Sequence, residues 1–153
     1  HCIAVDPWFI VSKTPEQARL IRTAREVNDS KPEWVIDQVK IKIAEYLQVN
    51  PSKTIKDVNI VCYGLAFKPD IDDLRESPAM EIALNLKKEY KKNLYIVEPY
   101  IDEESINGMN IIDFEKAKNK DIHVFLVKHS LFLGKLSEIN EEKIVDFCGM
   151  ILK

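Results

Sequence analysis

Apolar residues recur at helical spacing in the first part of the chain, and this pattern predicts a helix there. The stretch Thr14-Pro15-Glu16-Gln17 supplies a capping residue, a proline at the first helical position and a glutamine three residues after the cap. The apolar stripe that follows consists of Leu20, Ile21, Ala24 and Val27. We therefore expect a helix that starts after Thr14 and presents this stripe to another surface.

A second helix is predicted from Ser30, where Glu33 completes another capping box. Its stripe consists of Ile36, Val39, Ile43 and Leu47, and Asn50-Pro51 ends it. Two long and mostly charged helices in succession need an apolar surface to cover their stripes. Either the pair packs on its own domain, or it connects to a further domain or to a second copy of the chain.

From about residue 57 the pattern changes to short apolar runs that are typical of buried strands. The runs are 58–64 (VNIVCYG), 93–99 (NLYIVEP), 121–127 (DIHVFLV) and 142–147 (EKIVDF). The clearest intervening helix starts at Ser77-Pro78 and places on one face Ala79, Ile82, Ala83, Leu86 and Tyr90. This alternation indicates an α/β fold. We expect a Rossmann-like parallel sheet over residues 53–153, preceded by a helical connector over residues 1–52.

Composition and charge narrow the function classes. The 153 residues carry a net charge of −3 with acidic and basic residues interleaved, which does not favour binding to nucleic acid or to an anionic membrane surface. No apolar run approaches the roughly 20 residues of a membrane span, and no secretory signal pattern opens the chain. Three widely spaced cysteines without CxxC or HxxxH pairs predict no disulfide framework and no metal site, and they favour a reduced cytoplasmic setting.

The loop after the first predicted strand reads GLAFKPDIDDLRESPA over residues 64–79. It lacks the G-x-G-x-x-G of a dinucleotide turn, which argues against an independent NAD domain. Lys68 and Arg75 could contact phosphate oxygens, or they could only neutralise the three aspartates of the loop. Glu98 ends the second strand, where NAD domains place a ribose-binding acid, but without the glycines we do not expect that role here.

Two long segments, HCIAVDPWFIV at residues 1–11 and the loop at 64–79, together with the following VEP, resemble signature segments of the UDP-glucose/GDP-mannose dehydrogenase family. The resemblance implies a three-part protein: an N-terminal NAD-binding domain, a central helical region that forms a homodimer, and a C-terminal nucleotide-sugar domain. This chain would carry the end of the central region and the whole C-terminal domain, with the NAD domain expected ahead of His1.

The reaction that the resemblance implies is oxidation of a sugar C6 alcohol to a carboxylate by two hydride transfers to NAD. The matching Cys2 would form a thiohemiacetal and then a thioester, and Asp6 would handle protons or activate water. On a helix, the spacing of four residues places Cys2 and Asp6 on one face. Phe67 and Lys68 match positions that bind the UDP-sugar, and Arg75 matches an arginine that reaches NAD.

Within the family, the segments at residues 5–9 (VDPWF) and 75–79 (RESPA) resemble those of members that act on UDP-linked N-acetylmannosamine. The resemblance therefore implies this substrate, with its glucosamine epimer as the alternative. A non-catalytic nucleotide-sugar-binding and dimerisation module is the alternative from another class. Cys148 departs from the family pattern, since many relatives have a basic residue there that contacts substrate. His1 lies where relatives vary and is expected at most to contact substrate.

The remaining polar and aromatic candidates are assigned to packing or to solvent. Cys62 lies inside an apolar strand and is expected to be buried. His129 follows a strand and is expected in a solvated loop, although it could line a nucleotide site. Trp8 and Trp34 are expected to pack against neighbouring side chains.

Overall fold

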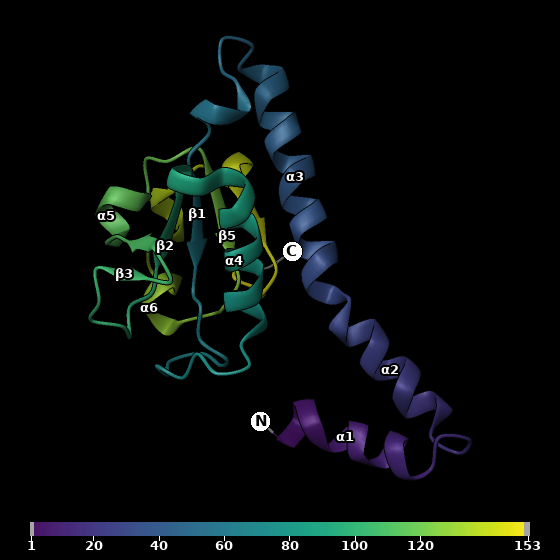
Figure 1. Ribbon diagram of the computed structural model, residues 1–153. Helices are drawn as coiled ribbons and strands as arrows, with labels where there is room; N and C mark the ends of the chain where they lie inside the picture. The colour runs from purple at the N-terminus through teal and green to yellow at the C-terminus, as the bar shows by residue number, and fades with distance from the viewer. Residues whose placement is uncertain (1, 152–153) are drawn as a thin grey trace.

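The computed structural model describes residues 2–151, apart from the side chain of residue 3, and contains a six-stranded sheet flanked by helices (Figure 1). His1, with its expected substrate contact, lies outside the described residues. The strands are β1 (Ile60–Tyr63), β2 (Leu94–Val97), β3 (Ser105–Ile106), β4 (Met109–Ile111), β5 (Ile122–Phe125) and β6 (Ile144–Asp146). Their spatial order is β3-β4-β2-β1-β5-β6. All neighbours pair in parallel except β3 and β4.

The strand order confirms the predicted α/β class and locates its switch point. The chain runs outward from β1 to β2 and β4, and then crosses back to β5 and β6 on the other side of β1. The carboxyl ends of β1 and β5 therefore flank the point where the winding reverses. In open parallel sheets this is the place where ligands bind.

Helices cover both faces of the sheet, which explains why the central strands β1 and β5 are buried along their whole length (Figure 1). Ile60 and Cys62 of β1 pack in one core cluster with residues of α3 (Lys31–Val49) and α4 (Pro78–Tyr90). Val61 and Tyr63 face the other way, into a cluster with residues of α5 (Phe114–Ala117) and the aromatic ring of Phe132 in α6 (Ser130–Leu133). Cys62 is fully buried, as expected.

Helix α4 follows its sequence prediction closely. The Ser77 hydroxyl accepts a hydrogen bond from the backbone N–H of Met80, and Pro78 occupies the first turn, where its missing N–H costs nothing. All the residues of the predicted stripe are buried: Ala79, Ile82, Ala83, Leu86 and Tyr90. Helix α4 therefore begins and packs as its local sequence predicts, and the loop that follows β1 ends at Ser77.

The predicted helix start at Thr14 is wrong. Residues Cys2–Lys13 already form helix α1, and the Thr14 hydroxyl donates back to the carbonyl of Ile10. Helix α2 (Arg19–Asp29) begins after a short turn, and its N-cap residue, Ala18, makes no side-chain cap. Thr14 therefore closes α1 and does not cap the next helix. The sequence signature located a helix boundary correctly but assigned Thr14 to the wrong helix.

The predicted capping box at Ser30 is also wrong. Its hydroxyl donates to the carbonyl of Val27, and its backbone keeps helical angles (φ −79°, ψ −11°). Helices α2 and α3 therefore follow each other with only Ser30 between them (Figure 1). The end of α3 is as predicted, because Asn50 forms its C-cap.

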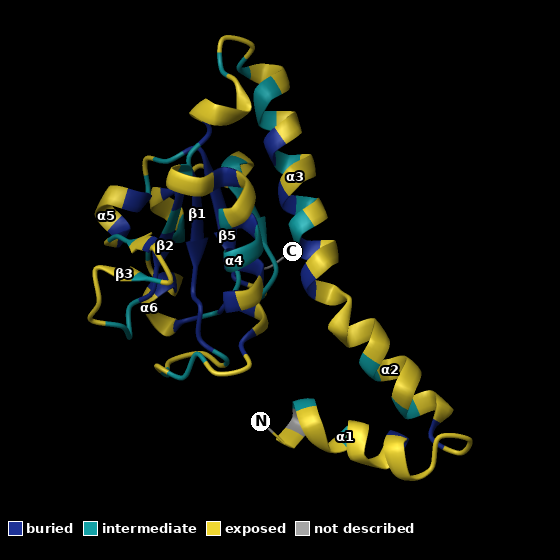
Figure 2. Ribbon diagram, in the orientation of Figure 1, coloured by how far each residue is buried: buried dark blue, intermediate teal, exposed yellow. Residues whose placement is uncertain are grey.

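The apolar stripes of α2 and α3 have different environments. Val39 and Ile43 of α3 are buried against the sheet domain, with Ile36 and Leu47 packed beside them. In α2, which Figure 2 colours mostly as exposed, Leu20 is 82% exposed and Val27 is 66% exposed, whereas Ile21 is half-buried. Packing on the same domain is therefore confirmed for α3, whereas the surface that would cover the stripe of α2 stays a prediction.

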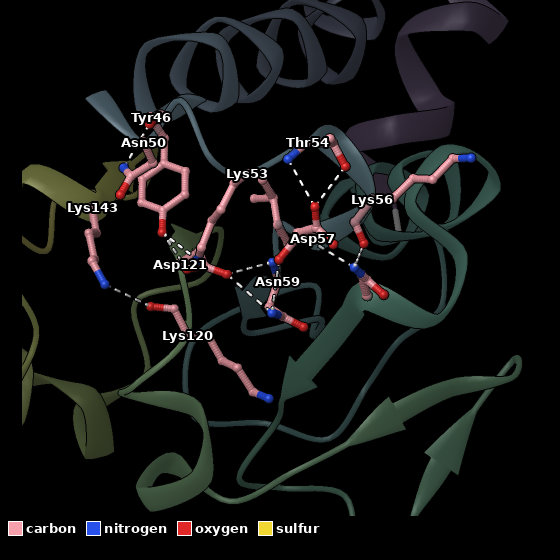
Figure 3. A network of polar contacts seen from close by, with 12 residues as sticks. Tyr46, Asn50, Lys53, Thr54, Lys56, Asp57, Asn59, Lys120, Asp121 and Lys143 are labelled. Atoms are coloured by element: carbon pink, nitrogen blue, oxygen red, sulfur yellow. Dashed lines mark hydrogen bonds and ion pairs between the residues drawn. The ribbon is translucent and has the colours of Figure 1, made fainter. Parts of the chain in front are cut away.

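A polar network fastens the end of α3 to the amino edge of the sheet (Figure 3). The Asp121 carboxylate, just before β5, accepts hydrogen bonds from the Lys53 ammonium (2.6 Å), the Tyr46 hydroxyl, and the backbone and side-chain N–H groups of Asn59. The remaining short helices are η1 (Ile55–Asp57), η2 (Lys91–Asn93), η3 (Leu136–Glu138) and η4 (Glu141–Lys143). Within residues 2–151, no helix is both long and apolar enough to cross a membrane.

Candidate functional site

The carboxyl edge of the sheet is built around Gly64, which directly follows β1. Its φ of +85° suits glycine, and a Cβ atom there would lie 2.5 Å from the Cβ of Val127. The Tyr63 carbonyl accepts the backbone N–H groups of Leu126 and Val127. The exits of β1 and β5 are therefore locked side by side, and the loop from Leu65 onward starts at the switch point.

The carboxyl group of Glu98 faces this loop rather than solvent. Its Oε2 atom accepts the backbone N–H groups of Leu65 (2.6 Å) and Ala66 (3.2 Å), and lies 3.2 Å from Nε2 of His129. Burial tends to raise the pKa of Glu98, but the hydrogen bonds from His129 and Leu65 outweigh it and hold the pKa below its usual range. Glu98 is thus an internal anion that occupies the N–H groups of the first turn.

The expectation that His129 lies in a solvated loop is wrong. Its side chain is fully buried, and its two ring nitrogens contact Glu98 and the backbone N–H of Asp70. Sequence reasoning missed this contact because the partners come from three separate segments. The available signal was positional: each of the three follows a strand of a parallel sheet, and such residues meet at one edge.

Phe67 and Lys68 lie in the same loop, beyond Ala66. Phe67 is half-buried, and the Lys68 ammonium is exposed, 6.0 Å from the centroid of the Phe67 ring. A cation and an aromatic face presented together suit an anionic, ring-containing ligand. Their assignment to the nucleotide sugar stays a prediction.

Arg75 has an exposed side chain that forms a bidentate ion pair within its own loop. Its Nε and Nη2 atoms donate to the two carboxylate oxygens of Asp73, at 2.9 and 2.8 Å. This pair lowers the pKa of Asp73 to about 2. The neutralising role considered for Arg75 is therefore present, and a contact with NAD would require the guanidinium to leave Asp73 or to use its outer face.

Cys2 and Asp6 both lie on α1, four residues apart and exposed, so they share one helix face as expected. Ala4, between them, lines a cavity of about 830 Å³ that Phe67 also lines. Other walls come from Arg25 of α2 and from Pro78 and Met80 of α4. In Figure 1 the start of α1 accordingly lies beside the loop that leaves β1.

The cavity brings the two predicted segments together but not every predicted residue. Among the described residues of its wall, α1 contributes Ala4, and the loop contributes Phe67 together with Leu74, Glu76 and Ser77. Four of the predicted site residues lie outside that wall: Cys2, Asp6, Lys68 and Arg75. Residues 2–151 contain no group of histidine, cysteine and carboxylate side chains arranged to hold a metal ion. The charged side chains of the cavity wall include Arg25 and Lys31 as cations and Glu76 and Glu81 as carboxylates.

Residues 61–152 match the sequence profile of the UDP-glucose/GDP-mannose dehydrogenase family, UDP binding domain. The chain belongs to this family. Its fold agrees with that of a solved UDP-D-ManNAc dehydrogenase from Pyrococcus horikoshii, with a TM-score of 0.75 over 100% of this chain and 35% of that one. At 24% identity, this likeness concerns the fold alone.

Curated family members are closer in sequence. A UDP-N-acetyl-D-mannosamine dehydrogenase of Escherichia coli K12 is 48% identical over 98% of this chain. An NDP-N-acetyl-D-galactosaminuronic acid dehydrogenase of Ralstonia solanacearum is 47% identical, also over 98%. The chain spans 37% of the length of the first protein and 34% of the second.

The three cysteines of this family member differ in accessibility, which predicts a simple labelling result. Burial raises the pKa of the Cys62 thiol to about 12, and burial together with Asp146 raises that of Cys148 to about 12, whereas Cys2 is exposed. We expect iodoacetamide at pH 8 to alkylate Cys2 at least about a hundredfold faster than the others. Peptide mass spectrometry over time measures this, with Cys2→Ser as the control that removes the fast phase. Equal labelling of Cys148 would contradict it.

Proposed function

We propose that this chain is the nucleophile-bearing and nucleotide-sugar-binding part of an NAD-dependent UDP-N-acetyl-D-mannosamine 6-dehydrogenase. The observation that carries the proposal is the 48% identity, across nearly all of this chain, to the Escherichia coli protein of that name. The shared cavity of the cysteine helix and the Phe67 loop supports it. Residues 1–52 then end the central helical region, and residues 53–153 bind the nucleotide sugar.

In the proposed reaction the C6 alcohol first loses a hydride and a proton to become an aldehyde. The Cys2 sulfur adds to the aldehyde carbon, its proton passes to the oxygen, and a thiohemiacetal results. Loss of a second hydride and proton leaves a thioester, and water cleaves the C–S bond to release the carboxylate and the thiol. Each of the two hydrides passes to a separate NAD, so one turnover consumes two molecules of the cofactor. Asp6, one helical turn from Cys2, takes the proton from the attacking water.

Within the described residues, the turn after β1 does not offer the N–H groups that a dinucleotide site would use. The N–H groups of Leu65 and Ala66, which a dinucleotide turn would present to a pyrophosphate, already donate to Glu98. Arg75 is the one residue that we assign to the cofactor, from its family match and its exposed position. We therefore place the main NAD site on a domain ahead of His1 in the same polypeptide.

A second candidate for the substrate is another UDP-linked sugar, such as the N-acetylglucosamine epimer. The Ralstonia relative, named for an N-acetylgalactosaminuronic acid, is only one percentage point less identical. Binding constants for the three UDP-N-acetylhexosamines would rank them. Tightest binding of the mannosamine form supports the proposal, and tightest binding of an epimer replaces it.

A homodimer is part of the proposal. The exposed apolar side chains Trp8 and Phe9 of α1 and Leu20 and Val27 of α2 suit burial against protein (Figure 2). If the chain binds UDP-sugar and dimerises but its Cys2 takes no part in turnover, the non-catalytic binding module is the better description.

Titration of the chain with UDP by calorimetry tests the binding function. We expect UDP to bind, and Lys68→Ala to weaken it by about tenfold to a hundredfold, because an ammonium–phosphate contact contributes about 1.5–3 kcal/mol. Lys92→Ala, at an exposed lysine in η2 near the opposite edge of the sheet, is the matched control. NAD should bind little. NAD binding without UDP binding would show that the ligand assignment is wrong.

A further inference from the structure

The segment Phe67-Lys68-Pro69 is held from both ends by buried and half-buried polar contacts. On one side, the N–H groups of Leu65 and Ala66 are fixed by Glu98. On the other side, the N–H of Asp70 is fixed by His129. Between these anchors, the Phe67 N–H donates to the Asp73 carbonyl at 2.8 Å, and the ring of Pro69 restricts the backbone further.

His129 connects the two anchors. Its Nδ1 atom accepts the Asp70 N–H at 2.9 Å, so this nitrogen carries a lone pair and the ring proton lies on Nε2. Nε2 then donates to the Glu98 carboxylate at 3.2 Å. Because the imidazole is fully buried, loss of either bond would leave a buried ring nitrogen without its partner.

The Asp70 carboxylate adds a third anchor, to the start of α6. Its Oδ1 atom accepts the Ser130 N–H (2.8 Å) and the Tyr100 hydroxyl (2.9 Å), and its Oδ2 atom accepts the Ser130 hydroxyl (2.6 Å). These bonds lower the pKa of Asp70, with the Ser130 hydroxyl as the largest cause. The backbone of Asp70 lies at φ +61°, a conformation that aspartate and asparagine tolerate better than most residues.

We propose that Glu98, His129 and Asp70 are positioning residues that hold Phe67 and Lys68 in the conformation that binds the nucleotide diphosphate. The proposal rests on the function proposed above for Phe67 and Lys68. A loop that is already ordered loses less conformational entropy when the ligand binds, so the anchors raise affinity without touching the ligand. The carboxylate of Glu98 already accepts the N–H groups of the turn after β1, so these groups do not bind the diphosphate. In this proposal the diphosphate binds at Lys68 instead.

Asp70 gives the sharpest test, because its side chain can be removed without straining the backbone. Asp70→Gly retains the positive φ and deletes the carboxylate, and we expect it to raise the dissociation constant for UDP about tenfold. Asp70→Asn retains the backbone preference and most acceptor positions, so it should stay within about threefold of the unsubstituted chain. Asp72→Gly adds equal backbone freedom at an exposed position of the same loop and should change affinity less than about twofold.

Combination with Lys68→Ala separates positioning from general stabilisation. If Asp70 acts through Lys68, then Asp70→Gly should raise the dissociation constant for UDP less than about twofold when Lys68→Ala is already present. If the two residues act independently, their effects on this constant would multiply. Urea unfolding of each variant confirms that it is folded at the titration temperature. If Asp70→Gly fails to fold, Ser130→Ala is the substitute, because it removes the hydrogen bond from the Ser130 hydroxyl to the Asp70 carboxylate. It should weaken UDP binding about threefold.

The outcomes distinguish this proposal from the function on which it rests. An unsubstituted chain that does not bind UDP would overturn both. UDP binding that Asp70→Gly and Ser130→Ala leave unchanged, or a full tenfold effect of Asp70→Gly that persists in the Lys68→Ala background, would overturn the positioning role alone.

Discussion

Asp121→Ala is expected to lower the free energy of unfolding by about 3 kcal/mol. The substitution leaves the Lys53 ammonium, the Tyr46 hydroxyl and the N–H groups of Asn59 without their shared acceptor (Figure 3). Asp121 itself is buried, but Lys53 is partly open to water, which keeps the loss below that of a fully buried pair. Chemical denaturation of the chain measures it.

The same network predicts acid sensitivity. Burial tends to raise the pKa of Asp121, but the hydrogen bonds from Lys53, Tyr46 and Asn59 prevail and depress it well below its usual range. A depressed folded-state pKa adds stability that is fully present above the unfolded pKa of about 3.9 and is lost as the pH falls through the lower folded value. The gap in unfolding free energy between the unsubstituted chain and Asp121→Asn should therefore shrink below about pH 4.

A matched control for both experiments is Asp102→Ala, at an exposed aspartate near the other edge of the sheet. We expect it to change the unfolding free energy by less than about 0.5 kcal/mol. If Asp121→Ala were equally mild, α3 would be held to the sheet domain by its apolar contacts alone, among them Val39 and Ile43.

Cys2→Ala should lower the rate of carboxylate formation at least about a thousandfold, in a polypeptide that unites this chain with an NAD domain. Without the sulfur there is no thiohemiacetal, so the second hydride must leave from the aldehyde or its hydrate. The aldehyde should therefore accumulate or be released after one equivalent of NADH. Absorbance of NADH and trapping of the aldehyde with a hydrazine measure the two steps.

Cys148→Ser is the matched control, since it changes a second thiol and retains a hydrogen-bond donor for Asp146. Its turnover should stay within about threefold of the unsubstituted enzyme. Carboxylate formation that survives Cys2→Ala would remove the covalent mechanism from the proposal but would leave the nucleotide-sugar site in place.

The elements of the sheet domain were predictable because they depend on local chemistry. Ser77 and Pro78 start α4, and alternate residues of β1 face two covered sides of the sheet. The helix start predicted at Thr14 and the capping box predicted at Ser30 were wrong for the same reason: each hydroxyl donates to a carbonyl of the preceding helix, although α3 does begin directly after Ser30. A capping residue has the same sequence signature whether it begins a helix or closes one.

The site was predictable only in its parts. The family segments pointed to Cys2, Asp6, Phe67, Lys68 and Arg75 by position in the sequence. That Arg75 pairs with Asp73, and that α1 shares a cavity with the Phe67 loop, followed only from the structure. Residue spacing along the chain does not say which of several nearby aspartates an arginine selects.

The sequence by itself determined the α/β class, the strands β1, β2, β5 and β6, helix α4 and the family, because periodicity, turn chemistry and long signature segments are local properties; the short strands β3 and β4 were not predicted. Only the tertiary structure decided that His129 is buried and that it joins Glu98 to the loop of Lys68. Those three groups lie on separate stretches of the chain, and they meet because parallel strands deliver their carboxyl ends to one edge. Such a contact exists only after the sheet has formed.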